Sequence, residues 1–136
     1  MRIGIDLGGT KIEAVVLDDN GDIQNRLRVA TPQTDYLATV LAIKELVSII
    51  EAELANGSFC SVGVGIPGAI SQATGKIKNA NSVCLIGQNL KADLTAALNR
   101  PIRLANDADC FALSEATDGA AKGKPLVFGV ILGTGV

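Results

Sequence analysis

The chain has 136 residues, of which 48% are hydrophobic, with 12 basic and 14 acidic residues and a net charge of −2. This composition predicts one folded domain with its own core, and the scattered charges offer neither a basic stripe for nucleic acid nor a polybasic membrane anchor. The absence of histidine excludes Ser-His-Asp and Cys-His catalysis and imidazole metal sites within these residues. No apolar run is long enough to span a membrane, so we expect a cytosolic protein with no membrane or nucleic-acid partner.

Three predicted strands open the chain, over residues 2–7, 11–18 and 23–30. The first alternates apolar side chains with small or polar ones, which is the period of a β-strand. Gly8-Gly9 and Asp19-Asn20-Gly21 indicate tight turns between the strands. The beginning of the chain is therefore predicted to be an antiparallel meander.

A long helix is predicted after Pro32, with Thr34 or Asp35 as its N-cap and Asn56-Gly57 as its end. Its apolar residues at near-helical spacing are Leu37, Leu41, Val47, Ile50 and Leu54. We expect this helix to cover one face of the sheet.

Strands and helices alternate in the rest of the chain. The predicted strands cover 61–66, ending at Pro67-Gly68, then 102–104 and 126–132, and a hairpin is predicted around 73–76. One helix is predicted from Asn89 or Leu90 to just before Pro101. Another is predicted from about Asp107 to Gly119, with Cys110, Phe111 and Leu113 on its apolar side. This order predicts an α/β fold with a mixed sheet of five to six strands and flanking helices.

The segment Asp6-Leu7-Gly8-Gly9-Thr10-Lys11 is the most informative local pattern, because it follows an apolar strand directly. Glycines there can take positive φ and let backbone N–H groups reach phosphate oxygens. Asp6 could hold Mg²⁺ directly or through water. The alternative is a plain Gly-Gly hairpin between two strands.

A second polar pair, Asn106-Asp107, follows the predicted strand 102–104. Ligands of open α/β sheets bind outside the carboxyl ends of strands, so Asp107 is placed to accept a proton from a substrate hydroxyl while Asn106 binds a neighbouring one. The alternative is that either residue only caps the following helix. Asp109 is predicted to be a first-turn acid that the helix dipole favours.

The chain ends in a second glycine- and threonine-containing segment, Gly133-Thr134-Gly135. It follows a predicted strand as the first segment does, so we expect the chain to be the front half of a larger protein, the alternative being an ordinary turn. The three cysteines, Cys60, Cys84 and Cys110, are expected to be small buried apolar residues.

Five segments in order resemble the ROK family of sugar kinases and regulators: DLGGTK at 6–11, GVGIPG at 63–68, KNANS at 78–82, LANDAD at 104–109 and LGTGV at 132–136. The resemblance implies an actin-like ATPase fold with two ribonuclease-H-like lobes, of which residues 1–136 would be the N-terminal one. Within the family, residues 78–82 and 118–121 are most similar to bacterial fructokinases that also phosphorylate mannose. It further implies a homodimer, and a zinc site only in the missing C-terminal lobe.

The resemblance also implies roles for individual residues. Asp107 would be the general base that deprotonates the sugar hydroxyl. The residues implied to contact the sugar are Gly65, Pro67, Gly68, Asn79, Asn81, Asn106 and Asp107. The residues implied to contact the phosphates of ATP are Asp6, Gly8, Gly9, Thr10, Lys11, Gly133, Thr134 and Gly135, with Asp6 also facing Mg²⁺.

The activity that this resemblance implies is the ATP-dependent phosphorylation of a hexose, with fructose as the expected acceptor at its 6-hydroxyl. The alternatives are an N-acetylhexosamine or glucose kinase, a sugar-responsive regulator, and a non-catalytic sugar-binding domain of the same fold. A regulator would need a DNA-binding module before Asp6, where only a few residues stand. The 136-residue chain alone is expected to fold and to lack kinase activity, because half a cleft cannot align the reactants.

Overall fold

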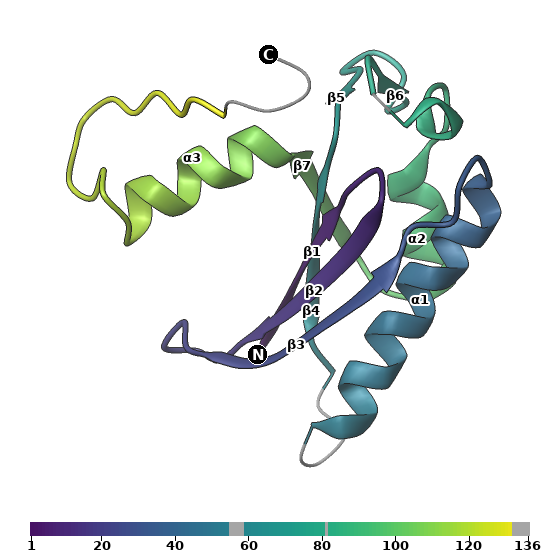
Figure 1. The fold of residues 1–136 in the computed structure, drawn as a ribbon, viewed down its shortest axis with the longest axis horizontal. Helices are drawn as coiled ribbons and strands as arrows, with labels where there is room; N and C mark the ends of the chain where they lie inside the picture. Colours follow the sequence, from purple (N-terminus) through teal and green to yellow (C-terminus); the bar gives the residue numbers. More distant parts are fainter. Residues whose placement is uncertain (55–58, 81, 132–136) are drawn as a thin grey trace.

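A five-stranded mixed sheet organises the part of the chain that this computed structural model describes, residues 1–54, 59–80 and 82–131 (Figure 1). The strands stand in the order β3-β2-β1-β4-β7, with bounds β1 Arg2–Leu7, β2 Lys11–Leu17, β3 Ile23–Ala30, β4 Ser61–Ile66 and β7 Ile102–Asn106. β1, β2 and β3 form the predicted antiparallel meander, while β4 and β7 run parallel to β1. The predicted α/β class with a mixed sheet is confirmed.

The register of the three parallel strands aligns their carboxyl ends. Asp6 of β1 stands opposite Gly65 of β4, and Ile66 stands opposite Asn106 of β7. Three of the segments singled out from the sequence therefore end at one edge of the sheet.

Two helices, α1 (Tyr36–Glu53) and α2 (Leu90–Leu98), cover the same face of the sheet (Figure 1). Asp35 and Asn89 cap them by accepting hydrogen bonds from Ala38 N and Ala92 N, as predicted. The core between helices and sheet holds, among others, Ile3, Ile5, Leu7, Ile12, Val16, Ile43, Leu46, Val47, Ile50, Val62, Val64, Ile66, Leu90, Leu94 and Ile102. Burial of these apolar side chains is the main force that fixes the domain.

The expected core face of α1 is wrong at its first turns. Leu37 and Leu41 are 70% and 62% exposed, while Val40, Ile43 and Val47 are buried. The buried stripe is set by where the helix lies on the sheet, and at about 100° per residue Leu37 and Leu41 point away from it.

The third helix, α3 (Asp107–Thr117), lies on the opposite side of the sheet from α1 and α2 (Figure 1). None of its residues is buried, and Phe111 and Leu113 are 40% and 68% exposed. Its predicted apolar side therefore enters no core in the described part of the chain. The expectation for the cysteines holds only for Cys60, since Cys84 is half-buried and Cys110 exposed.

Two short strands, β5 (Ala69–Ile70) and β6 (Ile77–Lys78), form the predicted small hairpin. A 3₁₀ turn, η1 (Val83–Leu85), follows and was not predicted. None of the helices within the described ranges is both long and apolar enough to cross a bilayer.

The predicted strand over 126–132 is wrong for its described residues, 126–131, which form no strand. Leu126 and Phe128 are 88% and 89% exposed. Apolar alternation makes a strand only where a neighbouring strand supplies its hydrogen bonds, and this segment runs beside α3 instead, with Gly129 against the ring of Phe111.

Candidate active site

A cleft of about 1060 Å³ opens on the sheet face that α1 and α2 leave uncovered. It lies between the sheet and α3, and its polar lining includes Asp6, Glu13 and Asp107. Gly65 lies in its floor, where an added Cβ would contact Cys110 Sγ at 3.6 Å and Asp107 Cα at 3.7 Å. The absence of a side chain at Gly65 therefore lets the first turn of α3 lie directly on β4.

Two carboxylates from distant parts of the sequence come together in this cleft. Partial burial raises the pKa of Asp6, and the nearby carboxylates of Asp107 and Glu13 raise it further, while Lys11 opposes them. The pKa of the Cys110 thiol is likewise raised by burial and then by Asp109, Asp107 and Asp6. Asp6 and Asp107 thus repel each other as like charges, and a cation bound beside them would reduce this repulsion.

The donor set at Asp6 fits Mg²⁺, which proteins usually bind through one or two carboxylates together with waters and phosphate oxygens. Within the described ranges, no cluster of three or more histidine, cysteine, aspartate or glutamate side chains could hold a metal. The expected zinc site concerns residues beyond this chain and stays a prediction.

Asn106 is the N-cap of α3, so the capping interpretation of this residue is confirmed. Its Oδ1 accepts from Ala108 N at 3.0 Å and Asp109 N at 3.3 Å, and its Nδ2 donates to Gly68 O at 2.7 Å. Both lone pairs of the amide oxygen are then used, and one N–H remains for a ligand. Capping and sugar contact are therefore compatible at this residue.

Gly68 joins the two segments predicted to bind sugar. It has a φ of 128°, and an added Cβ would lie 3.0 Å from Ala80 Cα and 3.0 Å from Lys78 O. Only glycine fits this backbone and this close approach. The turn at Pro67-Gly68 consequently contacts both Asn106 and the segment that carries the exposed, left-handed Asn79.

Asp107 opens α3 as an exposed residue. Its Oδ1 accepts from Ala108 N at 2.8 Å, which uses one of the two carboxylate oxygens. Asp109 also lies in the first turn, as predicted. Both carboxylates stand in the first turn of α3, where the N-terminal end of the helix dipole attracts negative charge.

The turn at Gly8-Gly9 is the hairpin between β1 and β2. Gly8 N donates to Lys11 O at 3.0 Å, and a Cβ on Gly8 would lie 2.8 Å from that same oxygen. Gly8 is thus required by the hairpin itself. Neither Gly8 nor Gly9 has a positive φ, so the turn does not use the backbone freedom that the sequence offers there. Gly9, Thr10 and Lys11 are exposed, so this hairpin remains accessible to a ligand.

Two of the predicted ligand-binding positions lie outside the described residues: Asn81 and Gly133-Thr134-Gly135. The last residue of the predicted strand over 126–132 lies outside them as well. The roles given to them stay predictions.

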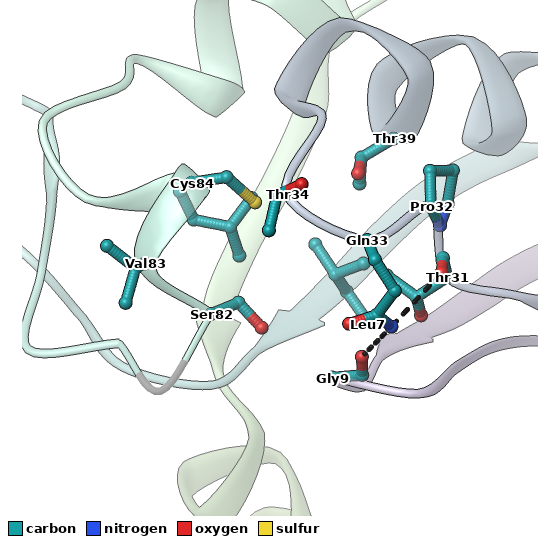
Figure 2. A pocket seen from close by; sticks show the side chains of 11 residues that line it. Leu7, Gly9, Thr31, Pro32, Gln33, Thr34, Thr39, Ser82, Val83 and Cys84 are labelled. Carbon is teal, nitrogen blue, oxygen red and sulfur yellow. Dashed lines mark hydrogen bonds between the residues drawn. The ribbon is translucent and has the colours of Figure 1, made fainter.

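Residues that the sequence reasoning missed lie behind the Gly8-Gly9 turn. Thr31, Gln33 and Ser82 line a smaller cavity of about 260 Å³ together with Gly9 (Figure 2). The pairing of β2 with β3 places Ala30 opposite Lys11, so Thr31 falls next to Thr10. The two predicted hairpins contained this signal, because antiparallel pairing places 31 near 10 once the turns are fixed.

The fold and the cleft define an α/β lobe of the actin-like sugar kinase type, with carboxylates at the carboxyl ends of two parallel strands, β1 and β7, that lie on either side of β4. Residues 2–136 match the ROK family, and the chain belongs to it.

The chain is similar to curated and solved proteins of this family. It is 48% identical over 136 residues to an N-acetyl-D-glucosamine kinase of Shigella flexneri serotype 5b (strain 8401). The matched region is all of this chain and 44% of that relative. A Streptomyces griseus ROK family glucokinase, solved with glucose and AMPPNP, superposes with a TM-score of 0.76 at 32% identity over 90% of this chain and 38% of that one. A ROK hexokinase from Thermus thermophilus superposes with a TM-score of 0.74 at 33% identity, over 90% of this chain and 40% of that one. The chain thus spans less than half the length of each.

Proposed function

We propose that this chain is the N-terminal lobe of an ATP-dependent sugar kinase in which Asp107 is the general base. The observation that carries the proposal is the meeting of Asp6 and Asp107 in one cleft, at the carboxyl ends of β1 and β7, the two parallel strands on either side of β4. Family membership and the similarity to sugar kinases along the whole chain support it.

Phosphoryl transfer needs alignment and charge stabilisation more than covalent catalysis. In the proposed reaction an oxygen of Asp107 accepts the proton of the sugar hydroxyl as that hydroxyl attacks the terminal phosphate of ATP. Asn106 orients the sugar through its remaining N–H, and the exposed Gly9-Thr10 backbone binds phosphate oxygens. Mg²⁺, held near Asp6, would neutralise charge on the phosphates when bound. The chemistry requires no histidine, which agrees with the composition.

We propose an N-acetylated hexosamine, with N-acetyl-D-glucosamine as the first candidate, rather than fructose. Relatives 48% identical over the whole chain are N-acetyl-D-glucosamine kinases. The fructose prediction rests on the similarity of residues 78–82 to fructokinases, and Asn81 in that segment lies outside the described residues. Phosphorylation of fructose therefore stays a prediction, and the assay described next tests it together with the hexosamine proposal.

The test is an ADP-release assay on the complete protein with N-acetyl-D-glucosamine, N-acetyl-D-mannosamine, glucose, mannose and fructose. We expect the highest kcat/KM with N-acetyl-D-glucosamine. A clear preference for fructose would reject the hexosamine proposal and keep the kinase. Binding of sugar without ADP release would favour the regulator or the non-catalytic domain, and the 136-residue chain assayed alone should release no ADP.

A further inference from the structure

The segment that follows β3 donates hydrogen bonds to the backbone of the turn between β1 and β2. Gln33 Nε2 donates to Gly9 O at 3.0 Å (Figure 2). Thr31 Oγ1 donates to Gly8 O at 2.7 Å, and Thr31 N donates to Thr10 O at 3.0 Å. The three consecutive carbonyls of the turn are therefore all held by two residues. These bonds join parts of the chain that are more than twenty residues apart.

These bonds fix the direction of the amide groups of the turn. In a planar trans peptide the carbonyl of one residue and the N–H of the next point in opposite directions. Because the Gly8 carbonyl faces Thr31, the N–H of Gly9 is directed away from it. Because the Gly9 carbonyl faces Gln33, the N–H of Thr10 is directed away as well.

Packing alone does not hold the turn from this side. The cavity of about 260 Å³ lies between the 31–34 segment, Gly9 and Ser82, and a Cβ on Gly9 would meet only Ser82 Oγ, at 3.7 Å. Thr34 adopts a φ of 56°, an uncommon conformation for a β-branched residue. The hairpin bond from Gly8 N to Lys11 O closes the turn, and on the side of the cavity the turn is held by the hydrogen bonds from Thr31 and Gln33.

We propose that Thr31 and Gln33 are positioning residues that hold the Gly8-Gly9-Thr10 turn so that the N–H groups of Gly9 and Thr10 face the phosphates of the nucleotide. This inference rests on the proposed kinase function. Thr31 has the larger role, since its side-chain bond is shorter and part-buried while that of Gln33 is exposed and competes with water.

The test compares Thr31→Val, Gln33→Met and the double variant with the unchanged complete protein. Valine keeps the shape of threonine and methionine the length of glutamine, but neither donates a hydrogen bond. We expect the KM for ATP to rise about three- to tenfold with Thr31→Val and less with Gln33→Met, while the KM for the sugar stays within about twofold. Thr31→Ser restores the hydroxyl donor and should return the KM for ATP to near its original value.

Thr95→Val is the matched control, because Thr95 Oγ1 donates to a backbone carbonyl, Lys91 O, at the same 2.7 Å but on α2. It should leave both KM values unchanged. Equal rises in the KM for ATP and for sugar, or an unchanged KM for ATP with Thr31→Val, would overturn the positioning role. A complete protein that releases no ADP with any sugar would instead reject the proposed function, and the inference with it.

Discussion

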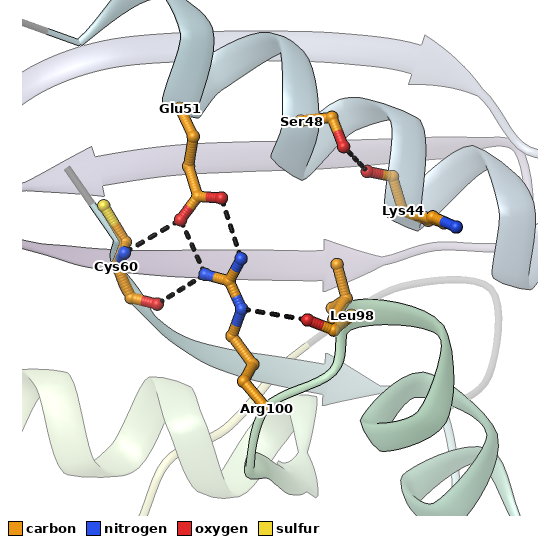
Figure 3. Close-up of polar contacts among 6 residues, drawn as sticks. All are labelled: Lys44, Ser48, Glu51, Cys60, Leu98 and Arg100. Carbon is orange, nitrogen blue, oxygen red and sulfur yellow. Dashed lines mark hydrogen bonds and ion pairs between the residues drawn. The ribbon is translucent and has the colours of Figure 1, made fainter. Parts of the chain in front are cut away.

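The two faces of the sheet differ in how their polar groups are satisfied. On the face covered by α1 and α2, the core is apolar and the arginine at its edge is paired: Arg100 donates to both oxygens of Glu51, at 2.6 and 2.8 Å, and to Cys60 O at 2.8 Å (Figure 3). On the other face, Asp6 and Asp107 lie near each other as like charges. A Cβ added to Gly4 or Gly63 there would meet no atom within 4 Å.

This difference separates the residues that stabilise the domain from those available for chemistry. The Arg100 side chain is only 8% exposed, and its guanidinium also lies over the Phe59 ring at 3.6 Å. It ties the end of α2 to α1 and to the chain just before β4. On the open face, Glu13 is paired with Arg26 and Arg28, whereas Asp6 and Asp107 face each other as like charges. A cation bound near Asp6 and Asp107 would reduce this repulsion.

The largest effect on stability is expected from Arg100→Ala. The variant leaves Glu51, whose side chain is 17% exposed, without its charged partner and with only the hydrogen bond from Cys60 N, so the free energy of unfolding should fall by about 3–5 kcal/mol. Unfolding in urea measures this. Arg103→Ala, a change of an exposed arginine on the open face, is the control and should stay within about 0.5 kcal/mol. Similar losses in the two variants would remove the contrast between the faces.

A matched pair of apolar truncations tests the same contrast. Ile43→Ala in α1 should cost about 2–5 kcal/mol, because Ile43 is 0% exposed. Leu113→Ala in α3 should cost less than about 1 kcal/mol, because Leu113 is 68% exposed. Thermal melting compares them. A large loss with Leu113→Ala would mean that α3 packs against a surface of the complete protein.

Asp107→Asn tests the chemistry of the open face. The asparagine oxygen can still accept from Ala108 N, so the fold and sugar affinity should change little. Turnover should fall by about 10²-fold or more, because a general base acts mainly in the transition state. Steady-state kinetics with sugar titration measures both. Near-normal turnover would remove Asp107 from the reaction.

Gly9→Val should weaken nucleotide binding by about tenfold, because a branched side chain would obstruct the approach of phosphate to the turn. The domain should remain folded, since the nearest atom to a Cβ there is Ser82 Oγ at 3.7 Å. Nucleotide titration together with thermal melting separates the two effects. Gly8→Ala is the contrasting variant, because its Cβ would lie 2.8 Å from Lys11 O and should destabilise the hairpin.

The smallest effect is the pH dependence of the Arg100 pair. Hydrogen bonds from Arg100 lower the pKa of Glu51 below 4.5, although burial opposes them. The ionised form is thus favoured in the folded state, so the pair's contribution is present above pH 4.5 and is lost as pH falls through the lowered pKa. Urea unfolding across this range should show the loss, and Glu51→Gln should show a weaker pH dependence.

The sequence predicted the elements whose signals are local. The turns at Gly8-Gly9 and Asp19-Asn20-Gly21, and the caps at Asp35 and Asn89, depend on a few neighbouring residues, so β1, β2, β3, α1 and α2 could be placed within a few residues. The polar residues Asp6, Asn106 and Asp107 were found for the same reason, because each lies within one residue of the end of a strand.

Tertiary structure decided which side chains these elements present to one another. Sequence periodicity put Leu37 on the core face of α1 and made 126–131 a strand, but the position of a helix on the sheet and the presence of a neighbouring strand are not local properties. Asp6 and Asp107 likewise come close only once the parallel pairing of the strands has set their register. The hydrogen bond from Thr31 to the Gly8 carbonyl in the same way requires the antiparallel pairing of β2 with β3. Local sequence fixes backbone geometry over a few residues, whereas contacts between distant residues depend on how the whole sheet assembles.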